Sequence, residues 1–195
     1  MRELKLGLLG GFRLERADGQ PVSVPTKKAK ALLAYLALHG REPQPRAKLA
    51  HLLWEDSDEG QARESLRQAL KLLRQALSPA CVSALIAQGD AVVFESAALD
   101  IDVVDFHRLI ETNRPQQLGS AAEQYRGQLL EGFDLKAPEF ENWLATERQR
   151  LNEKGSLRWR SCLLITLQTM PSIAASRSQL SCSRSIPCAK AHIAA

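Results

Sequence analysis

Apolar and basic residues form two parallel stripes in the segment 61–77. Four leucines have the i, i+4, i+7, i+11 spacing of one buried helix face: Leu66, Leu70, Leu73 and Leu77. Four cations repeat the same spacing: Arg63, Arg67, Lys71 and Arg74. At about 100° per residue, the basic stripe lies roughly 85° around the helix axis from the leucines. The pattern predicts a helix over 61–77 with one buried face and an adjacent cationic face.

Shorter elements are predicted before this helix. Alternating apolar residues predict a strand over 5–14, an Asp-Gly turn follows at 17–20, and 21–24 is predicted to be a short return strand. Helical spacing over 27–39, with Thr26 as N-cap and Gly40 as the stop, predicts a first helix. A turn at 43–45 and a second amphipathic helix over 46–54 are expected next, followed by an acidic connection at 55–60.

A β-hairpin is predicted after the long helix. Segments 82–86 and 91–94 have strand character, and Gln88-Gly89-Asp90 between them is a turn. Two strands, three helices and a hairpin are the order of a winged helix-turn-helix, an α+β fold. Such a fold places its third helix in the major groove of DNA, so the basic stripe is positioned to read DNA.

The candidate DNA-binding residues lie mainly on the third helix. We expect the basic stripe, defined above, to supply contacts to phosphates and base edges. Gln68 lies off the stripe and is a weaker candidate for reading bases. Lys27 and Lys28, near the start of the first helix, either contact phosphate or form part of a solvated face. The hairpin tip has no cation, which argues against insertion into the minor groove.

Several segments resemble a known family. LGGFRL at 9–14, KAKALLAYLALHG at 28–40, LAHLLWED at 49–56 and ARESLRQALKLLRQAL at 62–77 are similar to the antibiotic-regulatory-protein type of bacterial transcriptional activators. The DNA-binding part of those proteins is similar to the effector domain of OmpR-type response regulators. The resemblance implies a sequence-specific activator that binds double-stranded DNA. It also suggests pairing on direct repeats and a contact with RNA polymerase.

The second half resembles the same family. Segments 99–110, 125–133 and 137–151 are similar to the start of the bacterial transcriptional activator domain, an all-helical tetratricopeptide-like array. Amphipathic helices are expected at 121–130 and 139–151. The predicted division is a winged helix at 1–97, the start of the helical domain at 98–154, and an irregular tail at 155–195. A truncated array lacks the next repeat, so this half should be less stable than the winged helix.

The tail differs in composition from the rest of the chain. Residues 1–100 hold 14 basic and 12 acidic side chains, 101–153 hold 6 and 10, and 154–195 hold 6 and 0. The net charge of +4 therefore comes from the tail and says little about DNA. Two interpretations stay open: a disordered basic extension, or a tail translated out of frame. The codons of residues 186–194, read one base earlier, permit Asp-Pro-Leu-Arg-Glu, which resembles a segment of the helical domain.

Competing chemistry has little support. No two of the four histidines have metal-ligand spacing, and the four cysteines contain no C-x-x-C motif, so no metal, no cofactor and no enzymatic activity is expected. No signal peptide or membrane-spanning run is visible, so we expect a cytoplasmic protein with no membrane partner. The alternative function is a protein-protein interaction or scaffold module that uses the helical segment. A steep salt dependence of DNA affinity would distinguish the regulator from the scaffold.

Overall fold

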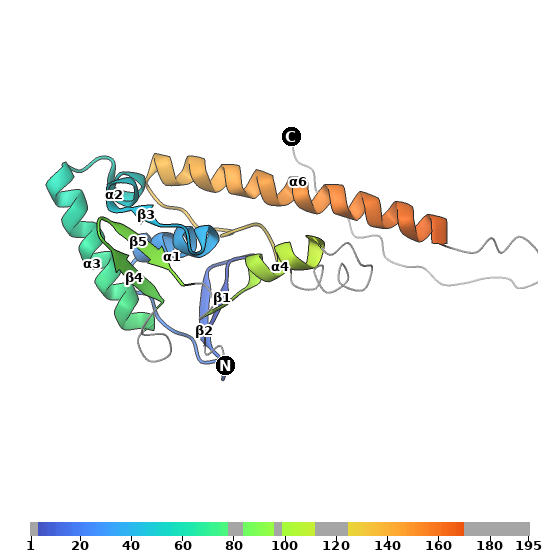
Figure 1. Ribbon diagram of the computed structural model, residues 1–195, viewed down its shortest axis with the longest axis horizontal. Helices are drawn as coiled ribbons and strands as arrows, with labels where there is room; N and C mark the ends of the chain where they lie inside the picture. Colours follow the sequence, from blue (N-terminus) through green and yellow to red (C-terminus); the bar gives the residue numbers. More distant parts are fainter. Residues whose placement is uncertain (1–3, 78–83, 96–98, 112–124, 170–195) are drawn as a thin grey trace, which may run out of the picture.

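The computed structural model describes residues 4–77, 84–95, 99–111 and 125–169, with side chains up to residue 153. These parts form two three-stranded sheets and five helices. Figure 1 shows α3 at one end of the molecule and α6 running along one side, where it extends beyond α4. The predicted class, a winged helix followed by a helical segment, is the class observed.

The first sheet joins the two ends of the winged-helix region. Strand β1 (Leu4–Gly7) pairs with β2 (Arg13–Arg16) antiparallel and with β6 (Leu99–Ile101) in parallel. The prediction of one strand over 5–14 is wrong, because the chain turns between β1 and β2. Gly10 has φ +88°, a conformation that glycine adopts without steric cost. Its N–H donates to the carbonyl of Gln128 rather than to a neighbouring strand of the hairpin.

The loop after β2 contains the predicted Asp-Gly turn. Gly19 has φ +85° and its N–H donates to the carbonyl of Arg16 over 2.9 Å. The return strand predicted at 21–24 is not a strand, since only Pro21 forms an isolated bridge, to Glu15. The bridge is formed by the N–H of Arg16 bonding to the carbonyl of Gln20 over 2.8 Å and the N–H of Val22 bonding to the carbonyl of Leu14 over 2.7 Å, and no further pair of described residues extends it into a strand.

Three helices follow at or near their predicted positions. Helices α1 (Lys27–His39) and α2 (Arg46–Trp54) agree with the expected bounds, and α3 (Glu59–Leu77) begins two residues early. The Thr26 hydroxyl accepts from the N–H of Ala29 over 3.1 Å, which confirms the predicted N-cap. Gly40, with φ +56°, ends α1 as expected and donates to the carbonyl of Leu36.

The second sheet contains the predicted hairpin. Strands β4 (Leu85–Gln88) and β5 (Ala91–Phe94) pair antiparallel, and β3 (Gln44–Pro45) adds to the other edge of β5. The hairpin is confirmed, but its first strand begins later than the predicted 82–86, of which 82–83 lie outside the described residues. Residues 44–45 were expected in a turn and instead form β3, because a residue before proline favours extended backbone.

The second half begins with helix α4 (Asp102–Glu111) and returns through an irregular segment to α6 (Pro138–Thr169). The helix expected at 121–130 is absent over 125–130, its described part. Leu130 and Gly127 have φ +50° and +152°, values that no α-helix contains. The N–H of Leu130 donates to the carbonyl of Leu8, so this segment pairs with the end of β1 instead of with itself.

The backbone of α6 continues past the predicted start of the irregular tail. Residues 155–169 are helical, so the expectation of irregular structure is wrong there. Extending a helix that is already nucleated adds one hydrogen bond for each residue fixed, which lets α6 run on beyond the body of the molecule. Residues 170–195 lie outside the described residues, and the frameshift interpretation stays a prediction.

One hydrophobic core crosses the predicted domain boundary. Buried side chains of α1, α2 and α3 form a cluster with residues of both sheets, with α4, and with α6 through Phe140 and Leu144. Strand β6 lies beyond residue 97 but belongs to the first sheet. The division at 97 stays a prediction, and its two sides are packed together in the structure.

The side chain of Asp102 forms hydrogen bonds between the start of α4 and the N-terminal part of the chain. Its carboxylate accepts from the N–H groups of Leu8 and Leu9 over 2.9 Å and of Val103 over 2.7 Å. Burial raises the pKa of Asp102, and the three N–H donors oppose this rise. The carboxylate therefore connects the residues directly after β1 to the first turn of α4.

Replacing Asp102 with asparagine is expected to lower the free energy of unfolding by about 1–3 kcal/mol, because an amide cannot satisfy all three donors. The raised folded-state pKa means that the folded protein binds more protons than the unfolded chain. The wild-type contribution therefore falls as the pH rises from the ordinary aspartate pKa through the raised one, and is constant above it. In denaturant titrations between about pH 3.5 and 7, the difference in free energy of unfolding between wild type and Asp102→Asn should fall as the pH rises, since the other carboxylates titrate in both proteins.

Asp105→Asn is the matched control on the same helix. Asp105 forms an i,i+3 ion pair with Arg108 over 2.7 Å at the surface. Such pairs contribute about 0–1 kcal/mol. Equal losses in the two variants would contradict the role assigned to Asp102.

Candidate nucleic-acid interface

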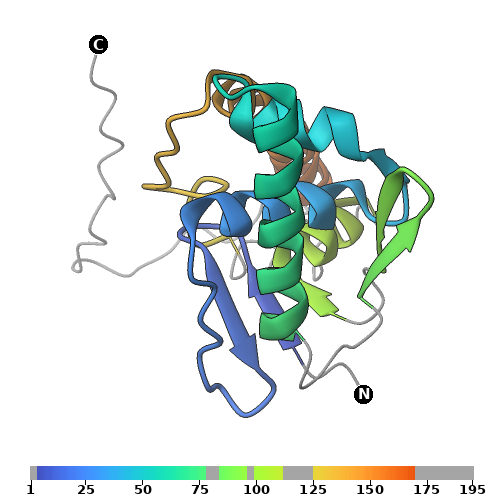
Figure 2. The same cartoon turned by 90° about the vertical axis from the view of Figure 1, so that its left-hand side faces the viewer.

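Helix α3 has a fully buried face, and its other faces are open. The buried positions include all four leucines of the predicted apolar stripe and two alanines: Ala62, Leu66, Ala69, Leu70, Leu73 and Leu77. They pack against α2 and α1. Figure 2 looks onto α3 from outside, where no described element lies in front of it. The predicted choice of buried face is therefore confirmed.

The six buried positions define which α3 residues point outward. At about 100° per residue, Glu64 and Gln75 lie roughly 170° from the mean direction of the buried positions. Gln68 and Lys71 follow at roughly 150°. All four side chains are exposed. Gln68, which lies off the basic stripe in the sequence, thus points as directly into solvent as Lys71 does.

The remaining cations of the stripe occupy the side of the helix. Arg67 lies roughly 110° from the buried direction, Arg74 roughly 90° and Arg63 roughly 70°. All three are exposed. All three lie on the same side of the helix, between the buried face and Lys71, so the stripe consists of one outward lysine and three lateral arginines. Cations on one side of a helix in a groove are positioned toward the phosphate chain on that side.

Two of the arginines are paired along the helix. Arg63 bonds to Glu59 over 2.5 Å and Arg67 to Glu64 over 2.8 Å. Within the described part of the chain, Lys71 and Arg74 have no acidic group within 4 Å. Surface ion pairs contribute about 0–1 kcal/mol, so phosphate can displace them at little cost.

Glu64 and Arg67 on the outward face stabilise each other in their charged forms. Hydrogen bonds from Arg67 and Gln68 lower the pKa of Glu64, and the bond to Glu64 raises the pKa of Arg67. Both groups stay ionised at neutral pH. The outward face is therefore a mixed surface, with one carboxylate among cations and amides.

A shallow hollow lies on this outward face. Its lining comes from α3 alone among the described residues: Glu64, Arg67, Gln68, Lys71, Leu72 and Gln75. Sequence reasoning proposed three of these residues and missed Glu64, Leu72 and Gln75. Counting Ala62 and Ala69 as part of the apolar face would have turned the predicted outward direction toward them.

Lys27 and Lys28 have partners inside the protein. The Lys27 ammonium donates to the carbonyl of Asp134 over 3.3 Å. The Lys28 ammonium lies 5.1 Å from the centroid of the Trp54 ring, and burial lowers its pKa while Asp56 opposes this change. Both contacts occupy the lysines in the free protein, so a role on phosphate would require them to be given up.

The hairpin tip is neutral to acidic. Gly89 has φ +56°, and the carbonyl of Asp90 accepts from the N–H of Arg46 at the start of α2 over 2.9 Å. Arg41, near the hairpin base, is paired with Glu95 over 2.7 Å. The hairpin is thus held against α2, with no cation at its tip.

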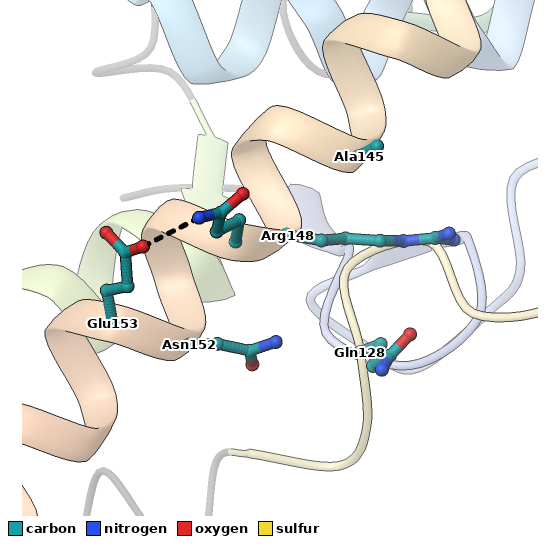
Figure 3. A pocket seen from close by; sticks show the side chains of 6 residues that line it. Gln128, Ala145, Arg148, Asn152 and Glu153 are labelled. Carbon is teal, nitrogen blue, oxygen red and sulfur yellow. Dashed lines mark hydrogen bonds between the residues drawn. The ribbon is translucent and has the colours of Figure 1, made fainter. Parts of the chain in front are cut away.

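A second hollow lies beside α6, and its lining comes from α6 and from Gln128 of the preceding segment. Arg148 points from α6 toward the segment that carries Gln128, as Figure 3 shows. Its guanidinium donates to the carbonyls of Leu129 and Leu130, each over 2.8 Å. The dashed line in Figure 3 joins Gln149 to Glu153 over 2.8 Å. The guanidinium of Arg148 thus bonds α6 to the segment 129–130, and its role is structural.

Other kinds of site are not found in the described ranges. No group of three or more histidine, cysteine, aspartate or glutamate side chains among them is arranged to hold a metal ion. None of the helices described there is long and apolar enough to cross a bilayer.

Comparison with known proteins identifies relatives of this architecture. No family model matches the chain. It is 28% identical over 177 residues to the regulatory protein AfsR of Streptomyces coelicolor, a match that covers 84% of this chain and 16% of AfsR. It also superimposes on Mycobacterium tuberculosis EmbR, solved in complex with a low-affinity phosphopeptide, with a TM-score of 0.64 and 23% identity.

The structural match covers 81% of this chain and 44% of the EmbR chain, and at this identity it shows a shared fold. The chain thus spans about a sixth of AfsR and less than half of EmbR. AfsR is described as a regulatory protein. Together these findings confirm the predicted resemblance to the antibiotic-regulatory-protein type of bacterial regulator, with a winged helix followed by a helical segment.

Proposed function

We propose that this chain is a sequence-specific DNA-binding regulator of transcription, of the activator type, which places α3 in the major groove. The observation that carries the proposal is the solvent-facing side of α3, where Lys71, Gln68 and Gln75 are exposed beside a row of exposed arginines on one side. Arginine and lysine are the side chains that bind phosphate and guanine edges, and glutamine can bind adenine.

The positions of the side chains on α3 support different roles for the arginines and for Lys71 and Gln68. We assign Arg63, Arg67 and Arg74 to phosphates along one edge of the groove, and Lys71 and Gln68 to base edges. Lys27 and Lys28 contribute only after leaving their present partners. The hairpin tip carries Asp90 and no cation, which argues against its insertion into the minor groove.

The resemblance also motivates proposals about partners. We propose that the chain acts in the cytoplasm, binds direct repeats as a pair of copies, and contacts RNA polymerase. The competing scaffold function would use the helical segment and would need no DNA affinity. Salt dependence separates the two, because each phosphate contact contributes about −0.9 to the slope of log K against log salt.

Arg67→Ala together with Lys71→Ala is expected to weaken DNA binding without unfolding the domain, since both side chains are exposed. Each lost phosphate contact should lower the salt slope by about one, and each lost base contact should cost about 1–3 kcal/mol at one position of the site. The experiment first selects duplexes from a randomised library with wild-type protein. Fluorescence anisotropy then measures affinity for a selected duplex between 50 and 200 mM salt.

Arg150→Ala is the matched control. Arg150 forms an i,i+3 ion pair over 2.7 Å with 65% exposure, close to the 2.8 Å and 74% of Arg67, but it lies on α6. Its removal should leave affinity and slope near wild-type values. A double variant that binds the selected duplex as tightly as wild type at 150 mM salt would show that α3 is not the reader.

A further inference from the structure

Glu64 is an anionic side chain at the centre of the surface proposed to face DNA. It lies roughly opposite the buried face of α3 and lines the outward hollow with Gln68 and Lys71. A carboxylate repels phosphates and the acceptor atoms of guanine and thymine. At this position Glu64 lowers the affinity for DNA of any sequence, so its role differs from that of its basic neighbours.

The hydrogen bonds of Glu64 leave one oxygen available. Arg67 Nη2 and Gln68 Nε2 both donate to Oε1, over 2.8 and 3.3 Å. The other oxygen, Oε2, accepts from no side chain or backbone group in the described part of the protein. Two neighbours one turn along the helix thus hold the carboxylate in place and ionised, with a free acceptor atom on an exposed face.

In the major groove, cytosine presents an N4 amino donor, guanine and thymine present acceptors, and adenine presents an N6 amino donor beside its N7 acceptor. Building on the proposed function, we propose that Glu64 is a specificity-determining residue that selects cytosine by accepting a hydrogen bond from its N4 amino group. Discrimination arises because the acceptor atoms of guanine and thymine repel the carboxylate, and the N7 acceptor of adenine repels it beside the N6 donor.

The test compares base preferences of variants at this one side chain. Wild-type protein, Glu64→Ala and Glu64→Gln are each used to select from a randomised duplex library. Dissociation constants are then measured for the wild-type duplex with each of the four base pairs at the position that changes. Wild type should prefer cytosine by about 5- to 150-fold at that position.

The two variants should fail in different ways. Glu64→Ala should flatten the preference to about twofold and bind unrelated duplexes more tightly, because a repulsive charge is removed. Glu64→Gln should transfer the preference toward adenine, since glutamine pairs with the adenine edge. The matched control is Glu59→Gln, which removes a carboxylate paired with Arg63 on the same helix but outside the hollow. It should keep the wild-type motif.

The outcomes separate this inference from the proposed function. If both Glu64 variants select the wild-type motif with unchanged ratios, while binding keeps its salt dependence, Glu64 does not read a base and the regulator function stands. If wild-type protein binds no duplex, both proposals are overturned. Unchanged circular dichroism and thermal midpoints of the variants would establish that altered selection does not come from unfolding.

Discussion

Replacing Leu70 with alanine is expected to lower the free energy of unfolding by about 2–5 kcal/mol. Leu70 is 1% exposed and lies in the middle of the buried face of α3, which packs on α1 and α2. Removing three carbon atoms there loses burial energy and leaves a cavity that rigid helices fill only in part. Domains of this size have about 5–15 kcal/mol in total, so the loss is a large share of the stability. Urea titration followed by circular dichroism measures it.

Leu72→Ala is the control for this substitution. Leu72 lies two residues further along the same helix, is half-buried, and lines the outward hollow. Its replacement should cost much less than that of Leu70, since surface substitutions are usually within about 0.5 kcal/mol. A thermal midpoint of Leu70→Ala within one or two degrees of wild type would mean that the wrong face of α3 has been placed in the core.

The second large effect is expected from Phe140→Ala, at about 3–5 kcal/mol. Phe140 is completely buried and belongs to a cluster of aromatic rings that joins α6 to α1. Its ring centroid lies 5.2 Å from that of Trp143 and 6.2 Å from that of Phe133. Trp143 in turn lies 4.9 Å from Tyr35 of α1. Losing Phe140 therefore weakens the contact between the helical segment and the winged helix.

Hydrogen exchange shows how far the effect of Phe140→Ala reaches. Because one core connects α6 with α1, α2 and α3, we expect protection to fall in residues 138–151 and in α3 together. Tyr125→Ala is the control, since this aromatic side chain is 40% exposed and should contribute little. A loss of protection confined to α6 would show that the helical segment unfolds on its own, as expected of a less stable second unit.

The interface of α3 could be found from the sequence only in part. Periodicity located the helix, its leucine stripe and its cations, because a long amphipathic helix repeats its pattern through several turns. The direction of the outward face depends also on Ala62 and Ala69, whose small side chains give no strong sequence signal. Because both alanines are buried, the side of α3 opposite the core is centred on Glu64 and Gln75. The contacts of Lys27 and Lys28 were also not predictable, since Lys27 bonds to Asp134, which is distant in sequence, and Lys28 lies over Trp54 of α2.

Local signals determined the elements whose causes are local. Thr26 and Gly40 delimit α1 through hydrogen bonds within one turn, and Gly89 permits the hairpin turn, so sequence alone placed both. The tertiary structure decided where backbone groups pair across long separations. Leu8–Gly10 and 128–131 bond to each other, so the former is no continuous strand and the latter no helix. A carboxylate such as Asp102 can satisfy N–H groups 93 and 94 residues away, and no period in the sequence records that choice.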